Sequence, residues 1–226
     1  PQPGMVYANL SARGECEAKA SQLAEFFERA RIEPADGLVR EPLAGGEERD
    51  MLHYRNKAVY HIEKKGASWA IGYRREPSHE IADIENDLLA RPEINAALGE
   101  IRRSVMMMLT QGPRAARRAI EGKGDVTVRW SKRSGVKWWM GDAPKGLILH
   151  ESLLGRPFDV PADGFWQVNG ECAEALARSV AAEFAAAATD RLVDLYCGVG
   201  SLGLSCGAPE EGHNLAARAA FKRSEM

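Results

Sequence analysis

The sequence contains no long hydrophobic run and few cysteines. No window of eighteen residues is apolar throughout, so we expect no membrane-spanning helix. The N-terminal residues lack a basic stretch followed by an apolar one, which argues against a signal peptide and favours a cytoplasmic protein. The four cysteines are scattered and show no Cys-x-x-Cys or other metal-binding spacing. We therefore expect reduced thiols and no bound metal.

The net charge is also small, −2 at pH 7, but the charges are unevenly distributed. Residues 102–145 carry eleven basic and three acidic side chains, an excess of eight positive charges, whereas acidic residues gather at 47–50 and 76–87. A basic field of this size is expected where the partner is a polyanion such as RNA. A solvated basic face without a partner is the alternative interpretation.

With 226 residues, 45% of them hydrophobic, the chain can form one sizeable globular domain or two small ones. Apolar periodicity predicts amphipathic helices at 15–30, 92–109 and 170–188, and a basic helical piece at 114–120. Alternation of apolar and polar residues predicts strands at 57–63, 68–74, 126–130, 136–140, 146–150, 158–160 and 192–196. Helices and strands mixed in this order predict the α/β class.

Two of the predicted helices show a stripe of apolar residues that we expect to face the core. In the helix at 92–109 the stripe consists of Ile94, Leu98, Ile101, Val105 and Met108. In the helix at 170–188 it consists of Cys172, Leu176, Val180 and Phe184.

The strands at 126–130 and 136–140 read as a hairpin with a basic turn. Lys132 and Arg133 lie at its tip, and Trp130 and Trp138 lie beside it. Aromatic side chains among basic ones can stack on nucleobases, so the turn is a candidate RNA contact. Packing of both tryptophans in the core is the alternative.

Residues 194–200 read Asp-Leu-Tyr-Cys-Gly-Val-Gly and follow the predicted apolar strand. Gly198 and Gly200 allow a tight turn and a close approach of the backbone to a ligand. A helix beginning near Ser201 offers unpaired N–H groups to such a ligand. The pattern predicts a loop that binds a nucleotide-type cofactor, with an ordinary strand-to-helix turn as the alternative.

Three motifs stand in one order along the chain: His-Tyr-Arg-Asn-Lys-Ala at 53–58, Phe-Trp-Gln-Val-Asn at 165–169 and the glycine loop at 194–200. Together they resemble the RNA (uracil-5-)-methyltransferases, the enzymes that make 5-methyluridine in tRNA and 23S rRNA. The resemblance runs from about residue 52 to residue 203, roughly two thirds of the chain.

The resemblance implies a particular fold and cofactor. We expect an N-terminal helix and connector at 1–50 and a small mixed α/β RNA-binding subdomain at 51–165. The beginning of a Rossmann-like class I methyltransferase domain, incomplete here, would follow at 166–226. S-adenosylmethionine is the implied cofactor, and the implied cofactor-binding residues are Gln167, Tyr196, Gly198, Gly200 and Ser201. The implied RNA-facing residues are Arg55, Asn56 and Lys57, to which the basic turn adds Lys132 and Arg133.

The chemistry of the family makes further demands on the sequence. Uracil C5 is a poor nucleophile, so a cysteine thiolate adds to C6, and a carboxylate base later removes the C5 proton. The segments that carry this cysteine and this glutamate are not found here, since Cys197 lies in the cofactor loop and Cys206 is misplaced. The resemblance therefore implies no catalytic residue in this chain.

These gaps lead us to expect a C-terminally truncated, inactive fragment that binds S-adenosylmethionine weakly or not at all and transfers no methyl group. The chain also starts too late for the N-terminal β-barrel of many members, and its cysteines cannot build the iron–sulfur cluster of some. A non-catalytic RNA-binding module is one alternative. A half-enzyme that needs a partner chain is the other.

Overall fold

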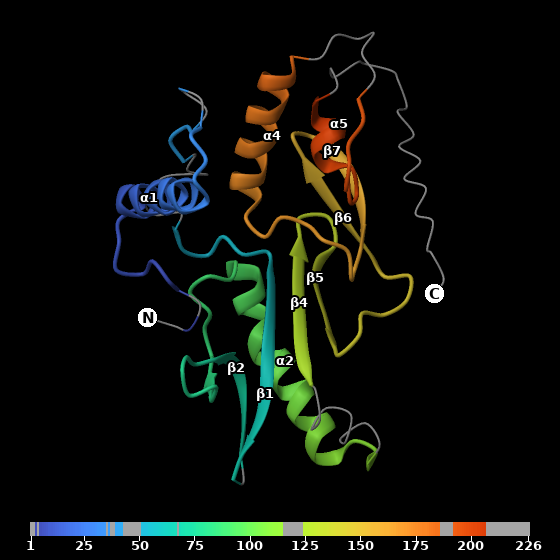
Figure 1. The fold of residues 1–226 in the computed structure, drawn as a ribbon. Coiled ribbons are helices and arrows are strands. Elements are labelled where there is room, and N and C mark those ends of the chain that lie inside the picture. The colour runs from blue at the N-terminus through green and yellow to red at the C-terminus, as the bar shows by residue number, and fades with distance from the viewer. Residues whose placement is uncertain are drawn as a thin grey trace, which may run out of the picture.

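The computed structural model describes residues 3, 5–34, 36, 39–42, 51–66, 68–114, 124–185 and 192–206, which form a mixed α/β structure (Figure 1). Its elements in chain order are α1 (Ala12–Ala30), β1 (Lys57–Lys65), β2 (Ser68–Arg74), β3 (Ile81–Asp83), α2 (Pro92–Gln111), β4 (Asp125–Ser131), β5 (Gly135–Met140), β6 (Ile148–Leu153), β7 (Arg156–Pro161), α4 (Gly170–Phe184) and α5 (Ser201–Cys206). The predicted α/β class is confirmed.

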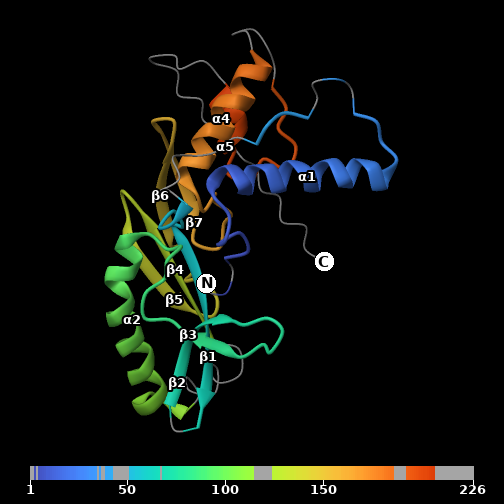
Figure 2. The same cartoon turned by 90° about the vertical axis from the view of Figure 1, so that its left-hand side faces the viewer.

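A five-stranded antiparallel sheet of order β3-β2-β1-β4-β5 forms the centre of the molecule. In its register Lys57 pairs with Arg129 across β1 and β4, and Val128 pairs with Trp138 across the β4–β5 hairpin. Helix α2 lies along one face of the sheet (Figure 2). The predicted strands at 57–63 and 68–74 and the predicted hairpin are confirmed, with small changes at their ends.

Helix α2 begins with Pro92 in its first turn, where the missing N–H of proline costs nothing. Its buried residues are Ile94, Leu98, Ile101, Val105 and Leu109. The expectation for Met108 was wrong, because this side chain is 37% exposed. The helical repeat places the residue four positions after Val105 on the core face.

A second layer consists of the β6–β7 hairpin with α4 and α5. Its apolar cluster contains Leu153, Phe158, Val160, Trp166, Ala173 and Ala177, and Val199, Leu202 and Leu204 pack against it. The predicted stripe of α4 was wrong, since Cys172, Leu176 and Phe184 are exposed and the buried residues are the two alanines. Small side chains let α4 approach its neighbours closely, and the larger apolar ones point outward.

The segment 192–196 is not a strand in this structure, which corrects the expectation of a buried one. Val193 is 78% exposed, Leu195 76% and Tyr196 fully exposed. A strand needs hydrogen-bonding neighbours, and no strand of the described residues pairs with this segment. The helix predicted to begin near Ser201 is confirmed as α5.

The predicted N-terminal helix is confirmed as α1, which buries none of its residues. Its ion pairs, such as Arg13 with Glu17 and Lys19 with Glu15, lie within the helix at a spacing of four residues. The basic helical piece predicted at 114–120 lies outside the described residues apart from Arg114, and so does the end of the helix predicted to reach 188. None of the helices in the described parts of the chain is both long and apolar enough to cross a membrane.

Candidate functional site

The first motif, residues 53–58, runs into the beginning of β1 at one end of the central sheet. The N–H of Arg55 donates to the carbonyl of Leu89 at 2.8 Å, and its carbonyl accepts from the N–H of Arg91 at 3.0 Å. On the other side, the carbonyl of Asn56 accepts from the N–H of Trp130 at 2.8 Å. The motif is therefore held between the segment that precedes α2 and the C-terminal end of strand β4.

Asn56 joins the first motif to the second. Its backbone N–H donates to the carbonyl of Val168 at 2.9 Å, and its side-chain Nδ2 donates to the carbonyl of Gln167, also at 2.9 Å. Arg55 forms an isolated antiparallel bridge with Asn169 in the same region. Asn56 is only 9% exposed, so these hydrogen bonds are made in a largely dry environment. Two segments that lie far apart in the sequence thus share one site.

The second motif leads directly into α4. Asn169 is the N-cap of this helix, and its Oδ1 accepts from the N–H of Cys172 at 3.1 Å. Trp166 is buried in the apolar cluster of the second layer, whereas the neighbouring Gln167 is exposed. The buried indole of Trp166 anchors this loop, and the adjacent side-chain amide of Gln167 stays accessible to solvent.

The third motif belongs to the same layer as Trp166, because Val199 packs on the cluster that contains this indole. Tyr196, Gly198 and Gly200 all have positive φ, +63°, +58° and +77°. A Cβ added at Gly198 would meet no atom within 4 Å, so the backbone there faces open space. The loop is therefore a tight turn that needs residues tolerant of positive φ, and its backbone is accessible at Gly198.

Asp194 ties the glycine loop to the helix that follows it. Its Oδ2 accepts from the N–H of Gly203 at 3.1 Å, and a Cβ at Gly203 would lie 2.8 Å from this oxygen. The hydroxyl of Ser205 donates to the carbonyl of Ser201 at 2.6 Å, which occupies a carbonyl of α5. The half-buried Ser201 thus lies at the start of a helix whose position is set by Asp194.

Arg129 is a buried base that the sequence did not distinguish from the exposed bases around it. It is 1% exposed and donates through Nη1 to the carbonyls of Ala162 and Gly164, both at 3.2 Å. Its Nη2 lies 3.4 Å from Oε1 of Glu151. Burial lowers the pKa of Arg129 and raises that of Glu151, and the opposite charge of each partner counteracts both shifts.

Position explains why Arg129 is buried. Strand β4 has α2 on one face, and the β6–β7 hairpin with the turn at 161–164 on the other. Lys57, its partner in the register, is half-buried, and burial together with the charge of Arg129 lowers the pKa of Lys57. Arg129 therefore connects the strand beside the first motif to the turn that precedes Gln167.

Asp87 is a second buried charge that the sequence did not single out. It is 0% exposed, and its Oδ2 accepts from the hydroxyls of Tyr60 at 3.0 Å and Tyr73 at 2.7 Å. Its Oδ1 accepts from the N–H groups of Leu89 and Ala90 at 2.9 and 3.2 Å. In the sequence it lies within an acidic stretch and gives no sign of burial.

The basic turn between β4 and β5 lies at the same end of the sheet as the first motif. Lys132 and Arg133 are both exposed there. Trp138 packs against the core, and so does Trp130, whose ring is covered by the guanidinium of Arg91 at 4.2 Å from its centroid. Both tryptophans thus pack against the core, as the alternative interpretation expected, and Lys132 and Arg133 remain exposed to solvent.

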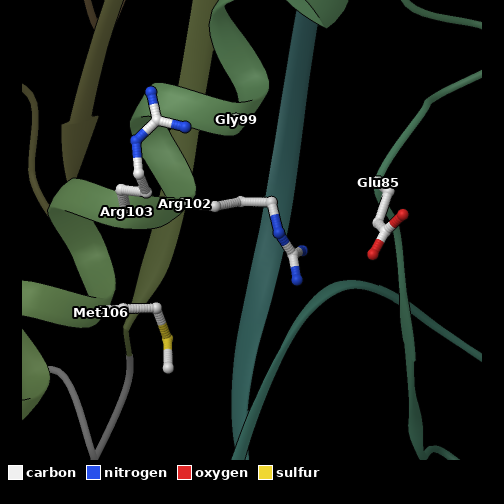
Figure 3. A pocket seen from close by; sticks show the side chains of 5 residues that line it. All are labelled: Glu85, Gly99, Arg102, Arg103 and Met106. Carbon is white, nitrogen blue, oxygen red and sulfur yellow. The ribbon is translucent and has the colours of Figure 1, made fainter.

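The basic excess of residues 102–145 is smaller at the surface than in the sequence. Arg102 is ion-paired with Asp83 at 2.8 Å and donates to the carbonyls of Ile71 and Ile84, and Arg129 is paired with Glu151. Figure 3 shows a hollow beside α2 that Arg102 and Arg103 line together with Glu85, Gly99 and Met106. None of the predicted site residues lines this hollow, which lies away from the three motifs.

No protein-family model matches the chain. The chain is similar to curated RNA methyltransferases over most of its length. The 23S rRNA (uracil(1939)-C(5))-methyltransferase RlmD of Aeromonas salmonicida is 26% identical over 87% of this chain. An uncharacterized RNA methyltransferase of Streptomyces avermitilis is 27% identical over 75% of it. The tRNA (uracil-54, C5)-methyltransferase of Pyrococcus abyssi, solved with S-adenosyl-L-homocysteine, matches 91% of this chain with a TM-score of 0.60 and 15% identity.

These relatives support the resemblance to RNA methyltransferases, among them a uracil-C5 methyltransferase of 23S rRNA. The resemblance carried by the three motifs is confirmed, and the structural match confirms the mixed α/β fold. The chain spans about half the length of the curated relatives it matches, 50% of the Aeromonas protein and 40% of the Streptomyces protein. It covers 56% of the solved Pyrococcus chain.

Proposed function

We propose that the chain is part of an S-adenosylmethionine-dependent RNA methyltransferase that acts on C5 of uridine in rRNA or tRNA. The names of its relatives support the reaction, and the S-adenosyl-L-homocysteine of the Pyrococcus structure supports the cofactor. The observation that carries the proposal is Asn56. Its two hydrogen bonds join the Arg-Asn-Lys motif to the Gln-Val-Asn motif, which the family resemblance places on the RNA and the cofactor respectively.

The residues present fit the cofactor. Gly198 has open space where a side chain would be, and the side chains of Gln167 and Tyr196 are exposed. In our proposal Gln167, Tyr196, Gly198, Gly200 and Ser201 hold S-adenosylmethionine, which supplies the methyl group. Asp194 sets the position of the loop through the N–H of Gly203.

The RNA surface in this proposal lies at the end of the central sheet. Arg55, Lys57, Lys132 and Arg133 present their charges there, and phosphate contacts from such side chains position RNA without reading its sequence. Asn56 lies buried behind this surface, where its Nδ2 donates to the carbonyl of Gln167 and holds the motif in place. The exposed cations of the turn take part in none of the ion pairs described above.

We further propose the domain limits 1–50, 51–165 and 166–226, with the RNA-binding subdomain in the middle and the start of a Rossmann-like domain at the end. In this arrangement Asn56 connects the second part to the third, because its Nδ2 donates to the carbonyl of Gln167. We place the protein in the cytoplasm with its RNA substrate, and we assign it no catalytic residue, metal or iron–sulfur cluster.

Fluorescence anisotropy with unmodified tRNA tests the RNA surface. We expect binding that weakens as salt rises, because each phosphate contact releases counterions. The double variant Lys132→Ala/Arg133→Ala should weaken binding and reduce the salt slope by about two. The matched control, Arg13→Ala/Arg29→Ala, removes the same charge from α1 and should leave binding unchanged. Equal losses in both double variants would contradict the proposed surface.

Titration calorimetry with S-adenosylhomocysteine tests the cofactor site. We expect weak binding, which Gln167→Ala and Tyr196→Ala reduce, whereas Leu176→Ala on the exposed side of α4 leaves it unchanged. Radiolabelled methyl transfer to unmodified tRNA or rRNA should stay at background for this chain, and incorporation above background would overturn the assignment of no catalytic residue. RNA binding with no response at Gln167 would favour a non-catalytic RNA-binding module.

A further inference from the structure

The buried carboxylate of Asp87 is linked to the backbone of the first motif. Its Oδ1 accepts from the N–H groups of Leu89 and Ala90, which orders the extended segment beside Arg55. The carbonyl of Leu89 then accepts from the N–H of Arg55 at 2.8 Å, and Ala90 forms a parallel bridge with it. The Nδ2 of Asn95 adds hydrogen bonds to the carbonyls of Asp87 at 2.8 Å and Ala90 at 3.2 Å.

The same carboxylate is linked to the side chain of Arg55 through a tyrosine. The hydroxyl of Tyr73 donates to Oδ2 of Asp87 at 2.7 Å and also interacts with the guanidinium of Arg55. Burial raises the pKa of Tyr73, and the charge of Asp87 acts in the same direction, whereas Arg55 opposes both. Because the hydroxyl of Tyr73 donates its proton to the carboxylate of Asp87, the hydroxyl oxygen becomes a stronger acceptor for the guanidinium of Arg55.

The guanidinium of Arg55 is held in place, but its hydrogen-bond donors are not all used by the described residues. Burial lowers its pKa, but a hydrogen bond with Tyr54 and the charge of Asp87 act in the opposite direction, and the pKa is raised overall. Its Nε is buried and has no hydrogen-bond partner among the described residues. An unpaired buried donor is costly, and the guanidinium therefore keeps a hydrogen-bonding capacity that no described residue satisfies.

We propose that Tyr73 and Asp87 are positioning residues that hold the Arg55 guanidinium ready to receive an oxygen of the RNA, a phosphate or a base carbonyl. The inference rests on the proposed function, in which Arg55 faces the RNA. Asp87 acts through two routes, the backbone of residues 89–90 and the Tyr73 hydroxyl. Neither residue contacts the RNA itself.

Tyr60 provides a matched control. Its hydroxyl donates to the same Oδ2 of Asp87 at 3.0 Å, its ring lies 5.3 Å from that of Tyr73, and it is more deeply buried. Of these two tyrosines, Tyr73 is the one that interacts with Arg55. Tyr60→Phe and Tyr73→Phe therefore remove equivalent hydrogen bonds from the carboxylate, but only the second removes the link to the guanidinium.

The test measures binding of fluorescein-labelled oligouridylate to the full chain and to four variants. Arg55→Ala and Tyr73→Phe should each weaken binding, Tyr73→Phe by about tenfold, or ~1.4 kcal/mol. Tyr60→Phe should bind as the wild type does, although both tyrosine variants lose stability. The double variant Arg55→Ala/Tyr73→Phe should bind no more weakly than Arg55→Ala alone. The Nε–H NMR signal of Arg55 should shift in Tyr73→Phe and stay in place in Tyr60→Phe.

The outcomes separate this inference from the proposed function. If Arg55→Ala binds as the wild type does, the assignment of Arg55 to the RNA surface fails. If Arg55→Ala is weak but the two tyrosine variants behave alike, the positioning role fails and the proposed function stands. Additive losses in the double variant would also overturn the positioning role, because they would show that Tyr73 acts independently of Arg55.

Discussion

Replacement of the buried Arg129 by methionine should destabilise the fold strongly. Arg129→Met keeps most of the volume of the side chain but removes its charge and its donors. It leaves the carboxylate of Glu151 buried without its cation, and it leaves the carbonyls of Ala162 and Gly164 without their shared donor. The side chains of Arg129 and Glu151 are 2% and 8% exposed, so water replaces little of what is lost.

The magnitude follows from this burial. Removal of one partner from a buried ion pair costs about 3–5 kcal/mol, because the remaining charge stays desolvated. The loss is comparable to much of the stability of a small domain. Exposed pairs such as Arg13–Glu17 contribute little to stability because water screens both charges, so Arg13→Met serves as a control with little effect.

The destabilisation should depend on pH. Burial already raises the pKa of Glu151 in the folded state, and Arg129 opposes this shift. Without Arg129 the folded pKa rises further above the unfolded value. A carboxyl with a raised folded pKa favours the folded state at low pH, and that contribution is lost as pH rises through the interval between the two values. The cost of Arg129→Met should therefore be larger at about pH 7 than at about pH 3, where Glu151 is protonated in both states.

Urea unfolding of the wild type and the variants at the two pH values measures these differences. Adding Glu151→Gln to Arg129→Met should restore part of the stability at neutral pH, because the uncompensated charge is removed. Equal destabilisation at both pH values, or a cost below ~1 kcal/mol at neutral pH, would refute the argument that a buried ion pair connects the two sheets.

Two further predictions concern the contacts between the motifs. Asn56→Ala should cost about 1–2 kcal/mol in urea unfolding, because the carbonyl of Gln167 loses its buried donor; an unchanged midpoint would contradict the link between the motifs. Gly203→Ala should displace Asp194 and accelerate hydrogen exchange in the glycine loop, whereas Gly170→Ala, which meets no atom within 4 Å, should not. Equal exchange rates in the two glycine variants would show that Asp194 does not set the loop.

Several elements could be predicted because their signals are local. The helix at 92–111 has a regular apolar repeat and a proline in its first turn, and the β4–β5 hairpin has clear alternation on both sides of its turn. The phase of α4 was misjudged because alanines and larger apolar residues occur all round this helix. Its neighbours select the alanines, which the sequence pattern alone could not show.

The segment at 192–196 shows the opposite case. Its apolar residues have strong β propensity, yet they are exposed and unpaired in the described structure. Strand formation depends on neighbouring strands that supply hydrogen-bond partners, so propensity does not decide it. The prediction for the helix at Ser201 was correct because a helix satisfies its hydrogen bonds within its own segment.

The sequence by itself determined the family resemblance, through three motifs in order. It also determined most of the helices and strands, because periodicity is encoded in short windows. Only the tertiary structure decided which residues meet. Asn56 donates a hydrogen bond to the carbonyl of Gln167, 111 positions away. Arg129 and Asp87 are buried and bind neighbouring segments, although most charged residues lie at the surface. Strand pairing and layer packing set these contacts over long separations, and charge alone does not reveal whether a side chain faces water or a carbonyl.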